Sequence, residues 1–184
     1  MKSVLMLSAA VIAGSLALGA CSRDSEPAQM LASVAAPAPQ IDPANYVQTA
    51  AMSDLFEVEA GKLATRRARS NEVRRFARMM VRDHTESTRK IKSAVMASNL
   101  SIQPPTTLDP EHQDKLSALR SAPRSDFDRQ YMEGQVDAHQ QALQLQQSYA
   151  QSGGDPNLKA VASELVPIVQ HHLDEAQTIV SNLR

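Results

Sequence analysis

The stretch that decides the fold is NEVRRFARMMVRDHTESTRKIKSAVMA, which occupies residues 71–97. Its apolar and small residues recur at intervals of three and four, namely Val73, Phe76, Ala77, Met80, Ser87, Ile91 and Ala94. This spacing places them on one face of an α-helix, as in an amphipathic helix that packs on a core. One ionisable side chain, His84, falls on the same face. The stretch therefore predicts a core helix with an inward-pointing histidine.

The N-terminal 20 residues contain one lysine and then an apolar run that is too short to span a bilayer as a mature helix. They predict a signal peptide over residues 1–20. The run ends in LGAC, residues 18–21, which resembles the lipobox of bacterial lipoproteins. We therefore expect Cys21 to be lipidated; the alternative is a plain signal peptide before a coincidental cysteine. Ser22 follows it, which by resemblance to Gram-negative sorting rules favours an outer-membrane anchor facing the periplasm.

Composition and charge exclude several kinds of site and partner. Cys21 is the only cysteine, so its lipidation would exclude disulfides, iron–sulfur clusters and cysteine-ligated zinc. The net charge is -1 and the aromatic residues are three Tyr and three Phe, without Trp, so we expect no nucleic-acid partner. The arginines of residues 71–97 lie largely on the polar face of their helix. We expect that face to be solvated, although it could also meet anionic lipid head groups.

The chain divides into a leader, a tether and one helical domain. After the lipidated cysteine, residues 22–44 contain four prolines and no sustained period, so residues 21–44 form a Pro/Ala-rich tether. The domain covers residues 45–184. Its predicted helices, in chain order, occupy residues 45–68, 71–97, 109–120, 125–151 and 155 onward, with Ser70, Ser125 and Asp155 as N-caps and a kink at Pro167.

The connections between the four long helices predict their topology. The first and last are short, whereas residues 99–124 form a long connection with four prolines and one short helix. Short, long and short connections favour an all-α, ferritin-like four-helix bundle in which a long crossover joins two antiparallel hairpins.

Four stretches of the domain resemble a known family. They are FEVEAGKLA (56–64), EVRRFARMMVRDHT (72–85), FDRQYMEGQVDAHQ (127–140) and LVPIVQHHL (165–173). Together they resemble a bacterial ferritin-like domain-of-unknown-function family whose members are often labelled outer-membrane proteins. The resemblance implies the fold and a location in the cell envelope, and the family has no established activity to carry over.

Five inward residues are candidate ligands of a transition metal such as Zn, Cu or Fe: Glu57, Glu59, His84, His139 and His172. Counted from the turns, Glu57, His84 and His139 lie at nearly one height, and His172 about one helical turn away. Asp83, Asp137 and His171 are candidates to support these ligands from behind.

A di-iron site is disfavoured. Ferritin-like di-iron proteins carry a Glu three residues before the ligating His on two helices. Here the residues at those positions are Val81, Val136 and Val169.

Two functions therefore stay open. In the first, the chain is a lipid-anchored periplasmic module for binding or structure, not an enzyme, and each buried histidine is hydrogen-bonded to a neighbouring polar residue. In the second, the histidines and glutamates hold a single metal ion for binding or redox chemistry. Both are compatible with a homo-oligomer, and neither names a protein partner.

Overall fold

The computed structural model describes residues 40–183. In this range the chain forms five helices: α1 Pro43–Arg67, α2 Asn71–Ala97, α3 Pro110–Ser121, α4 Phe127–Ser152 and α5 Pro156–Asn182. These residues contain no β-strand, only an isolated bridge between Ile41 and Gly153. The predicted all-helical fold is confirmed. The predictions for the leader, Cys21 and most of the tether lie outside the described residues.

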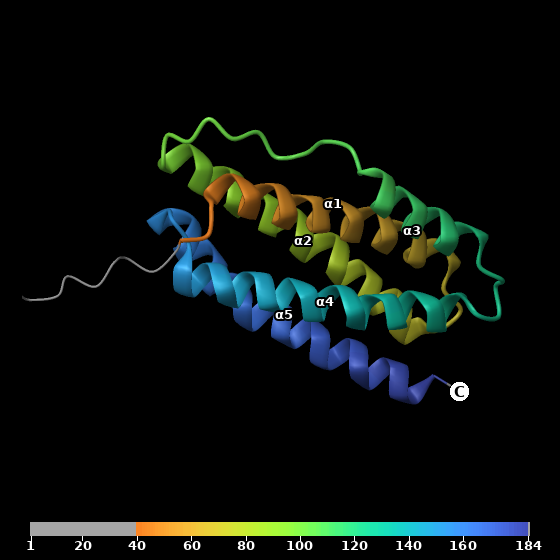
Figure 1. Cartoon of the computed structure of the whole chain (residues 1–184). Helices are drawn as coiled ribbons and strands as arrows, with labels where there is room; N and C mark the ends of the chain where they lie inside the picture. The colour runs from red at the N-terminus through yellow and green to blue at the C-terminus, as the bar shows by residue number, and fades with distance from the viewer. Residues whose placement is uncertain (1–39, 184) are drawn as a thin grey trace, which may run out of the picture. The chain divides into compact units, whose positions relative to one another are not determined.

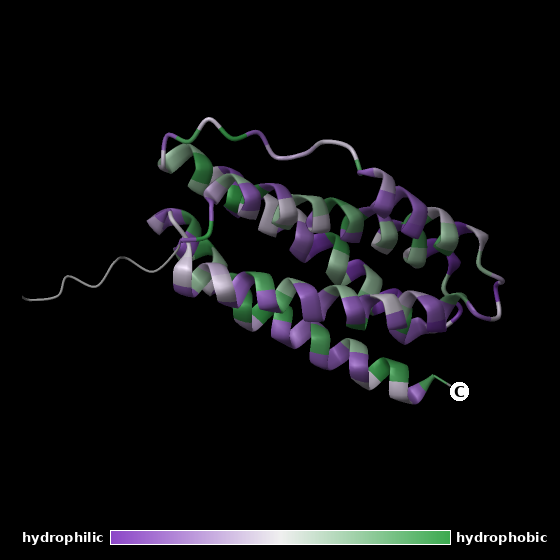
Figure 2. Ribbon diagram, viewed as in Figure 1, coloured by the Kyte–Doolittle hydropathy of each residue, from purple (hydrophilic) through white to green (hydrophobic). Residues whose placement is uncertain are grey.

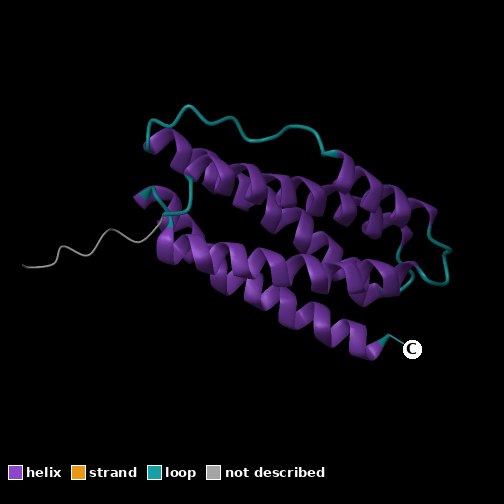
Figure 3. Ribbon diagram, viewed as in Figure 1, coloured by secondary structure: helices purple, strands orange, loops and turns teal. Residues whose placement is uncertain are grey.

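The long helices form two pairs (Figure 1). Helix α1 packs against α2, α4 packs against α5, and the pairs meet through α2 with α5 and α1 with α4. The connection from α2 to α4 returns along α1, where Gln48 Nε2 donates to the carbonyl of Gln103 at 2.7 Å (Figure 3). None of the described helices is long and apolar enough to cross a bilayer.

Asp-Pro pairs start three of the helices. Asp42, Asp109 and Asp155 each accept a hydrogen bond from the backbone N–H three residues ahead, and a proline follows each of them. Proline suits the first helical position because its φ is already helical and its missing N–H would have no partner there. The pair at Asp42 starts α1 two residues before the predicted position.

The start of α4 corrects another prediction. Ser125 does not cap this helix, which begins at Phe127 after Asp126. The N–H groups of Asp126 and Phe127 instead donate to the carbonyl of Pro123, so a turn precedes the helix. Ser70 does cap α2, as predicted, by accepting from the N–H groups of Glu72 and Val73.

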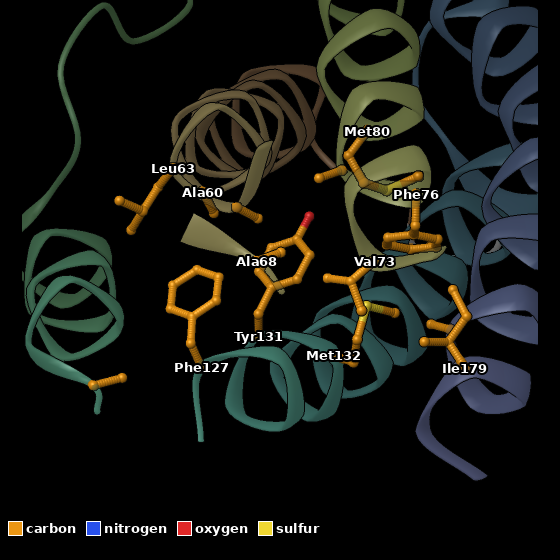
Figure 4. Packing of buried hydrophobic residues seen from close by; sticks show 14 of the residues in the cluster. Ala60, Leu63, Ala68, Val73, Phe76, Met80, Phe127, Tyr131, Met132 and Ile179 are labelled. Carbon is orange, nitrogen blue, oxygen red and sulfur yellow. The ribbon is translucent and has the colours of Figure 1, made fainter. Parts of the chain in front are cut away.

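The interior contains two apolar clusters with polar side chains between them. One cluster gathers around Phe76, Tyr131 and Met132, and Figure 4 shows these side chains meeting with Ile179 of α5. The other gathers around Tyr46, Ile91 and Tyr149. Figure 2 shows hydrophilic and hydrophobic residues on different faces of the helices. On all four long helices the sequence passes from one cluster to the other through a buried polar residue.

We call these residues the polar layer. Its members are Asp54, Glu57, His84, Gln135, His139 and His172, all of them buried. Burying so many polar groups costs free energy unless they are paired, so the layer is the first place to look for function.

Candidate metal centre

Three histidines of the polar layer meet in the interior. His84 comes from α2, His139 from α4 and His172 from α5. One ring nitrogen of each lies within 4.8 Å of those of the other two. Nε2 of His84 lies 3.4 Å from Nε2 of His139. The three side chains predicted to point inward therefore meet, including that of His172, which we had placed about one helical turn away.

The remaining nitrogen of each ring contacts an oxygen. His84 Nδ1 lies 2.8 Å from Asp54 Oδ1, His139 Nδ1 lies 2.8 Å from the carbonyl of Gln135, and His172 Nε2 lies 3.1 Å from Asp83 Oδ2. A carbonyl or carboxylate oxygen can only accept, so each of these nitrogens carries the hydrogen and donates. In the neutral rings the lone pairs are consequently on His84 Nε2, His139 Nε2 and His172 Nδ1.

The charge of the cluster is concentrated on one ring. Burial favours the neutral form of His84, but the hydrogen bond and charge of Asp54 outweigh it and raise the pKa of His84. Burial, with the charge of His84 next, lowers the pKa of His139 to about 3 and that of His172 to about 4. Without a metal, His84 is therefore the ring of the three that is protonated most readily.

Glu57 lies in the same layer without joining the three nitrogens. Its Oε2 accepts a hydrogen bond of 2.6 Å from Gln135 Nε2, and its Oε1 is buried and finds no partner in the described part of the chain. Burial raises the pKa of Glu57, against the opposing charge of His84 and the bond from Gln135. Because the backbone carbonyl of Gln135 holds His139, Glu57 supports the cluster from one residue away.

Three predicted site residues lie away from the cluster. Glu59 is 37% exposed and pairs with Lys62, because its position on α1 points beside the packed face. Asp137 is exposed on α4 and lines a surface groove. His171 is 67% exposed and lies 3.6 Å from Glu175, because consecutive helical residues point about 100° apart and His172 occupies the inward position.

Asp83 contacts a ring of the cluster that comes from another helix. We expected it to support a metal ligand, and it accepts from His172 of α5, not from the adjacent His84. Its second partner is Arg82, at 2.6 Å.

The height predicted for His172 is wrong. Counting backbone positions put it about one turn away from His139, yet the two ring centroids are 5.3 Å apart. Helical side chains lean toward the N-terminus of their own helix. In the antiparallel pair α4 and α5 the two rings therefore lean toward each other along the axis, which reduces the difference.

The sequence analysis missed Asp54 and Gln135. The spacing along both helices could have indicated them. Asp54 lies three residues before Glu57, and Gln135 lies four before His139, so each shares a helical face with a residue that was predicted. Measured from the helix ends, Asp54 lies 13 residues before Arg67 and His84 lies 13 after Asn71, so the two share one height. Counting from Ser70 had favoured Glu57 instead.

The donor set fits a transition-metal ion. His172 Nδ1 is buried and has no hydrogen-bond partner in the described residues, which is costly for a ring nitrogen. Imidazole nitrogens are suitable ligands for Cu, Zn, Fe and Ni, and outer oxygen acceptors of the kind found here fix the ring orientation. An ion among the three lone pairs would satisfy all of them.

Comparison with known proteins identifies the family. Residues 28–179 match the model of a family described as "Domain of unknown function (DUF4142)", and the chain belongs to this family. No functionally curated protein matches the sequence.

Several solved structures share the helical fold. A DUF305 fragment from Deinococcus radiodurans aligns with a TM-score of 0.66 and 15% identity, covering 77% of this chain and 96% of its own. CopM in the Cu(II)-bound form aligns with a TM-score of 0.67 and 15% identity, covering 79% of this chain and 100% of its own. CopM in the Cu(I)-bound form aligns with a TM-score of 0.65 and 14% identity, covering 78% and 98%. At such identities the likeness concerns the fold alone.

Proposed function

We propose that this member of the DUF4142 family binds one transition-metal ion inside its helical domain, on His84, His139 and His172, with copper as the first candidate. The observation that carries the proposal is the convergence of three buried ring nitrogens within 4.8 Å, one from each of three helices. A purely structural network would pair each nitrogen, whereas His172 Nδ1 has no partner among residues 40–183.

Each residue has a part in holding the ion. The three imidazoles supply the ligand nitrogens, while Asp54, Asp83 and the carbonyl of Gln135 hold the rings from outside. The two carboxylates also offset part of the positive charge of a buried ion. Binding requires His84 to lose the proton that its raised pKa favours, so acid should weaken the site.

Copper is preferred to zinc and iron for two reasons. The fold is shared with CopM, whose structures were solved with Cu(II), Cu(I) and Ag bound, and three imidazoles form a ligand set that copper accepts. The Glu-x-x-His pairs of ferritin-like di-iron proteins are missing at Val81, Val136 and Val169. Zinc and iron are kept as competitors in the test.

The proposal includes a location and a topology. Supported by the sequence LGAC at residues 18–21, we propose that Cys21 is lipidated and that a tether holds the domain on the periplasmic side of the outer membrane. We also propose that the two helix pairs joined by a long connection are a ferritin-like four-helix arrangement. Cys21→Ala should leave a folded domain that no longer partitions into detergent, and equal partitioning of the variant would contradict the lipid anchor.

The metal proposal is tested by competition with a chromophoric chelator, on protein purified without a histidine tag. Cu(I) under reducing conditions, Cu(II), Zn(II) and Fe(II) are titrated separately. We expect one copper ion per chain, and loss of this stoichiometric site in His139→Gln and His172→Gln.

The chain supplies its own control. It has five histidines, and His112 and His171 lie outside the cluster. His112→Gln and His171→Gln should bind copper as the unchanged protein does. Failure of every metal to bind, or equal loss in the control variants, would overturn the proposal, and stoichiometric zinc in preference to copper would overturn the choice of metal.

A further inference from the structure

Arginines gather at one end of the helical domain. This end contains the last turns of α1, α3 and α5, residues 71–78 of α2, the first turn of α4, and the α1–α2 and α3–α4 connections (Figure 1). Their closeness is fixed by contacts: Asp128 at the start of α4 accepts from the N–H groups of Arg69 and Ser70 in the α1–α2 turn. Seven exposed arginines lie on these segments, and one of them, Arg129, pairs with Glu133. We call the other six the arginine end: Arg66, Arg69, Arg75, Arg78, Arg120 and Arg124.

The guanidinium groups of the arginine end are not paired with other groups of the described residues. None of the six makes an ion pair or a side-chain hydrogen bond within residues 40–183, although several carboxylates elsewhere are paired. Two neighbouring arginines behave differently. Arg67 donates to the carbonyls of Leu119 and Ala122 and lies over the ring of Phe127, and Arg74 donates to the carbonyl of Ala68.

Carboxylates do not balance this charge locally. Asp128 is buried and occupied by backbone N–H groups, and Glu133 lies 3.6 Å from Arg129. Glu72 and Asp126 are the carboxylates of these turns that are left without an ion pair among the described residues. Since the whole chain has a net charge of -1, the positive charge is segregated to this end.

The arginine end also differs from other basic sites of the domain. Lys92 and Lys159 lie near the opposite end, at the last turns of α2 and the first turn of α5. Lys90 and Lys115 are paired with Glu164 and Glu111. Guanidinium groups present a planar fork that matches phosphate oxygens, which an ammonium group does not.

We propose that the arginine end docks on the phosphate-bearing surface of an anionic bilayer. Its charges come from several separate segments at the end of the helices, an arrangement suited to an extended, charged surface. Among the described residues, Met96 is the one large hydrophobic side chain that is exposed, and it lies at the other end of α2. The arginine end therefore lacks the apolar centre that protein–protein interfaces bury. Docking is therefore electrostatic and falls with salt.

This inference is independent of the metal site and of lipidation. The test uses the chain from Ser22 onward, which contains every described residue and lacks Cys21, with folding checked by circular dichroism. Co-sedimentation is measured with vesicles of phosphatidylcholine alone and with equal parts of phosphatidylglycerol. Binding is expected only to the anionic vesicles, and it should weaken steeply between 50 and 300 mM NaCl.

Matched double variants locate the surface. Arg75→Gln with Arg78→Gln should weaken binding about 30-fold, at about 1 kcal/mol for each basic residue near an anionic surface. Lys92→Gln with Lys159→Gln removes the same charge from the opposite end and should change binding less than threefold. Equal loss in both variants, or no binding to anionic vesicles at 50 mM NaCl, would overturn the proposal. Binding to polyphosphate or an acidic peptide without binding to vesicles would overturn it in favour of a soluble partner.

Discussion

His84 Nδ1 and Asp54 Oδ1 are 2.8 Å apart, and the side chains of both residues are 6% exposed. This bond joins α1 to α2 at the height where α4 and α5 bring their own histidines. A carboxylate behind an imidazole makes the ring a better metal ligand and fixes its tautomer. The same bond is also structural, because removing one member of a buried charged pair leaves the other without a partner.

The first prediction separates these two roles. Asp54→Asn keeps an oxygen that can accept from His84 Nδ1 and keeps the size of the side chain, but it removes the charge that raises the pKa of His84. We expect the domain to fold and copper affinity to fall about 10- to 100-fold. Chelator competition measures the affinity, and Asp137→Asn, on the exposed face of α4, is the control. Unchanged affinity in Asp54→Asn would mean that this carboxylate does not support a ligand.

The second prediction concerns the pH dependence of stability in the presence of chelator. The pKa of His139 is about 3 in the folded protein and 6.5 in the unfolded chain. Between these values the unfolded chain binds more protons, so stability is present above pH 6.5 and is lost as the pH falls. By pH 5 the loss for a shift of this size is about 2 kcal/mol.

His172, with a folded pKa of about 4, acts in the same direction. His84 acts oppositely, since its raised pKa gives stability that is present below pH 6.5 and is lost as the pH rises through its folded value. We therefore expect His139→Gln to lose about 2 kcal/mol less than the unchanged protein between pH 7 and pH 5, as measured by urea unfolding.

The fold was more predictable than the site. Helix positions follow from periodicity and capping, and the pattern Val73, Phe76, Ala77, Met80 predicted the buried face of α2 correctly. The errors at helix starts were local: the Asp-Pro signal was used at Asp109 and Asp155 but not at Asp42. Such errors do not change which face is buried.

The site depended on relations between helices that a single sequence does not contain. Which histidines point inward could be inferred from spacing, but the partner of each ring depends on the relative shift of two helices by a few ångströms. Thus Asp83 serves His172 on another helix, and Asp54 replaces Glu57 as the partner of His84. Glu59 was misplaced because it lies three residues after Phe56 and four before Leu63, and this spacing does not separate the centre of the packed face from its edge.

The third prediction concerns Glu57. Burial raises its pKa, so its contribution to stability is present at low pH and is lost as the pH rises through its folded value. Glu57→Gln keeps an acceptor for Gln135 Nε2 and cannot ionise, so it should be at least as stable as the unchanged protein, with the difference growing as the pH rises above 4.5.

Glu57→Leu is the matching disruptive change. It removes the acceptor and strands the buried Gln135 Nε2, which should cost about 1–3 kcal/mol at any pH in this range. Urea unfolding of both variants at pH 5.5 and 8 measures the difference. If Glu57→Gln is less stable than the unchanged protein at pH 8, the carboxylate is required in its charged form.

The last prediction concerns the close approach of α1 and α2 beside the site. At Gly61 a Cβ atom would lie 2.9 Å from the carbonyl oxygen of Ala77 and 2.9 Å from Val81 Cγ2. The backbone carbonyl cannot move without shifting α2, so Gly61→Ala should cost about 1–3 kcal/mol even though alanine is the better helix former. Gly134 on α4 is the matched control, because a Cβ there would meet nothing within 4 Å. Gly134→Ala should stabilise the domain by about 0.5–1 kcal/mol.

Because Gly61 lies on the face of α1 that carries Asp54, Gly61→Ala should also weaken copper binding while Gly134→Ala does not. Urea midpoints and chelator competition measure the two effects, and a Gly61→Ala protein as stable as the Gly134→Ala protein would show that α1 and α2 are not held this closely.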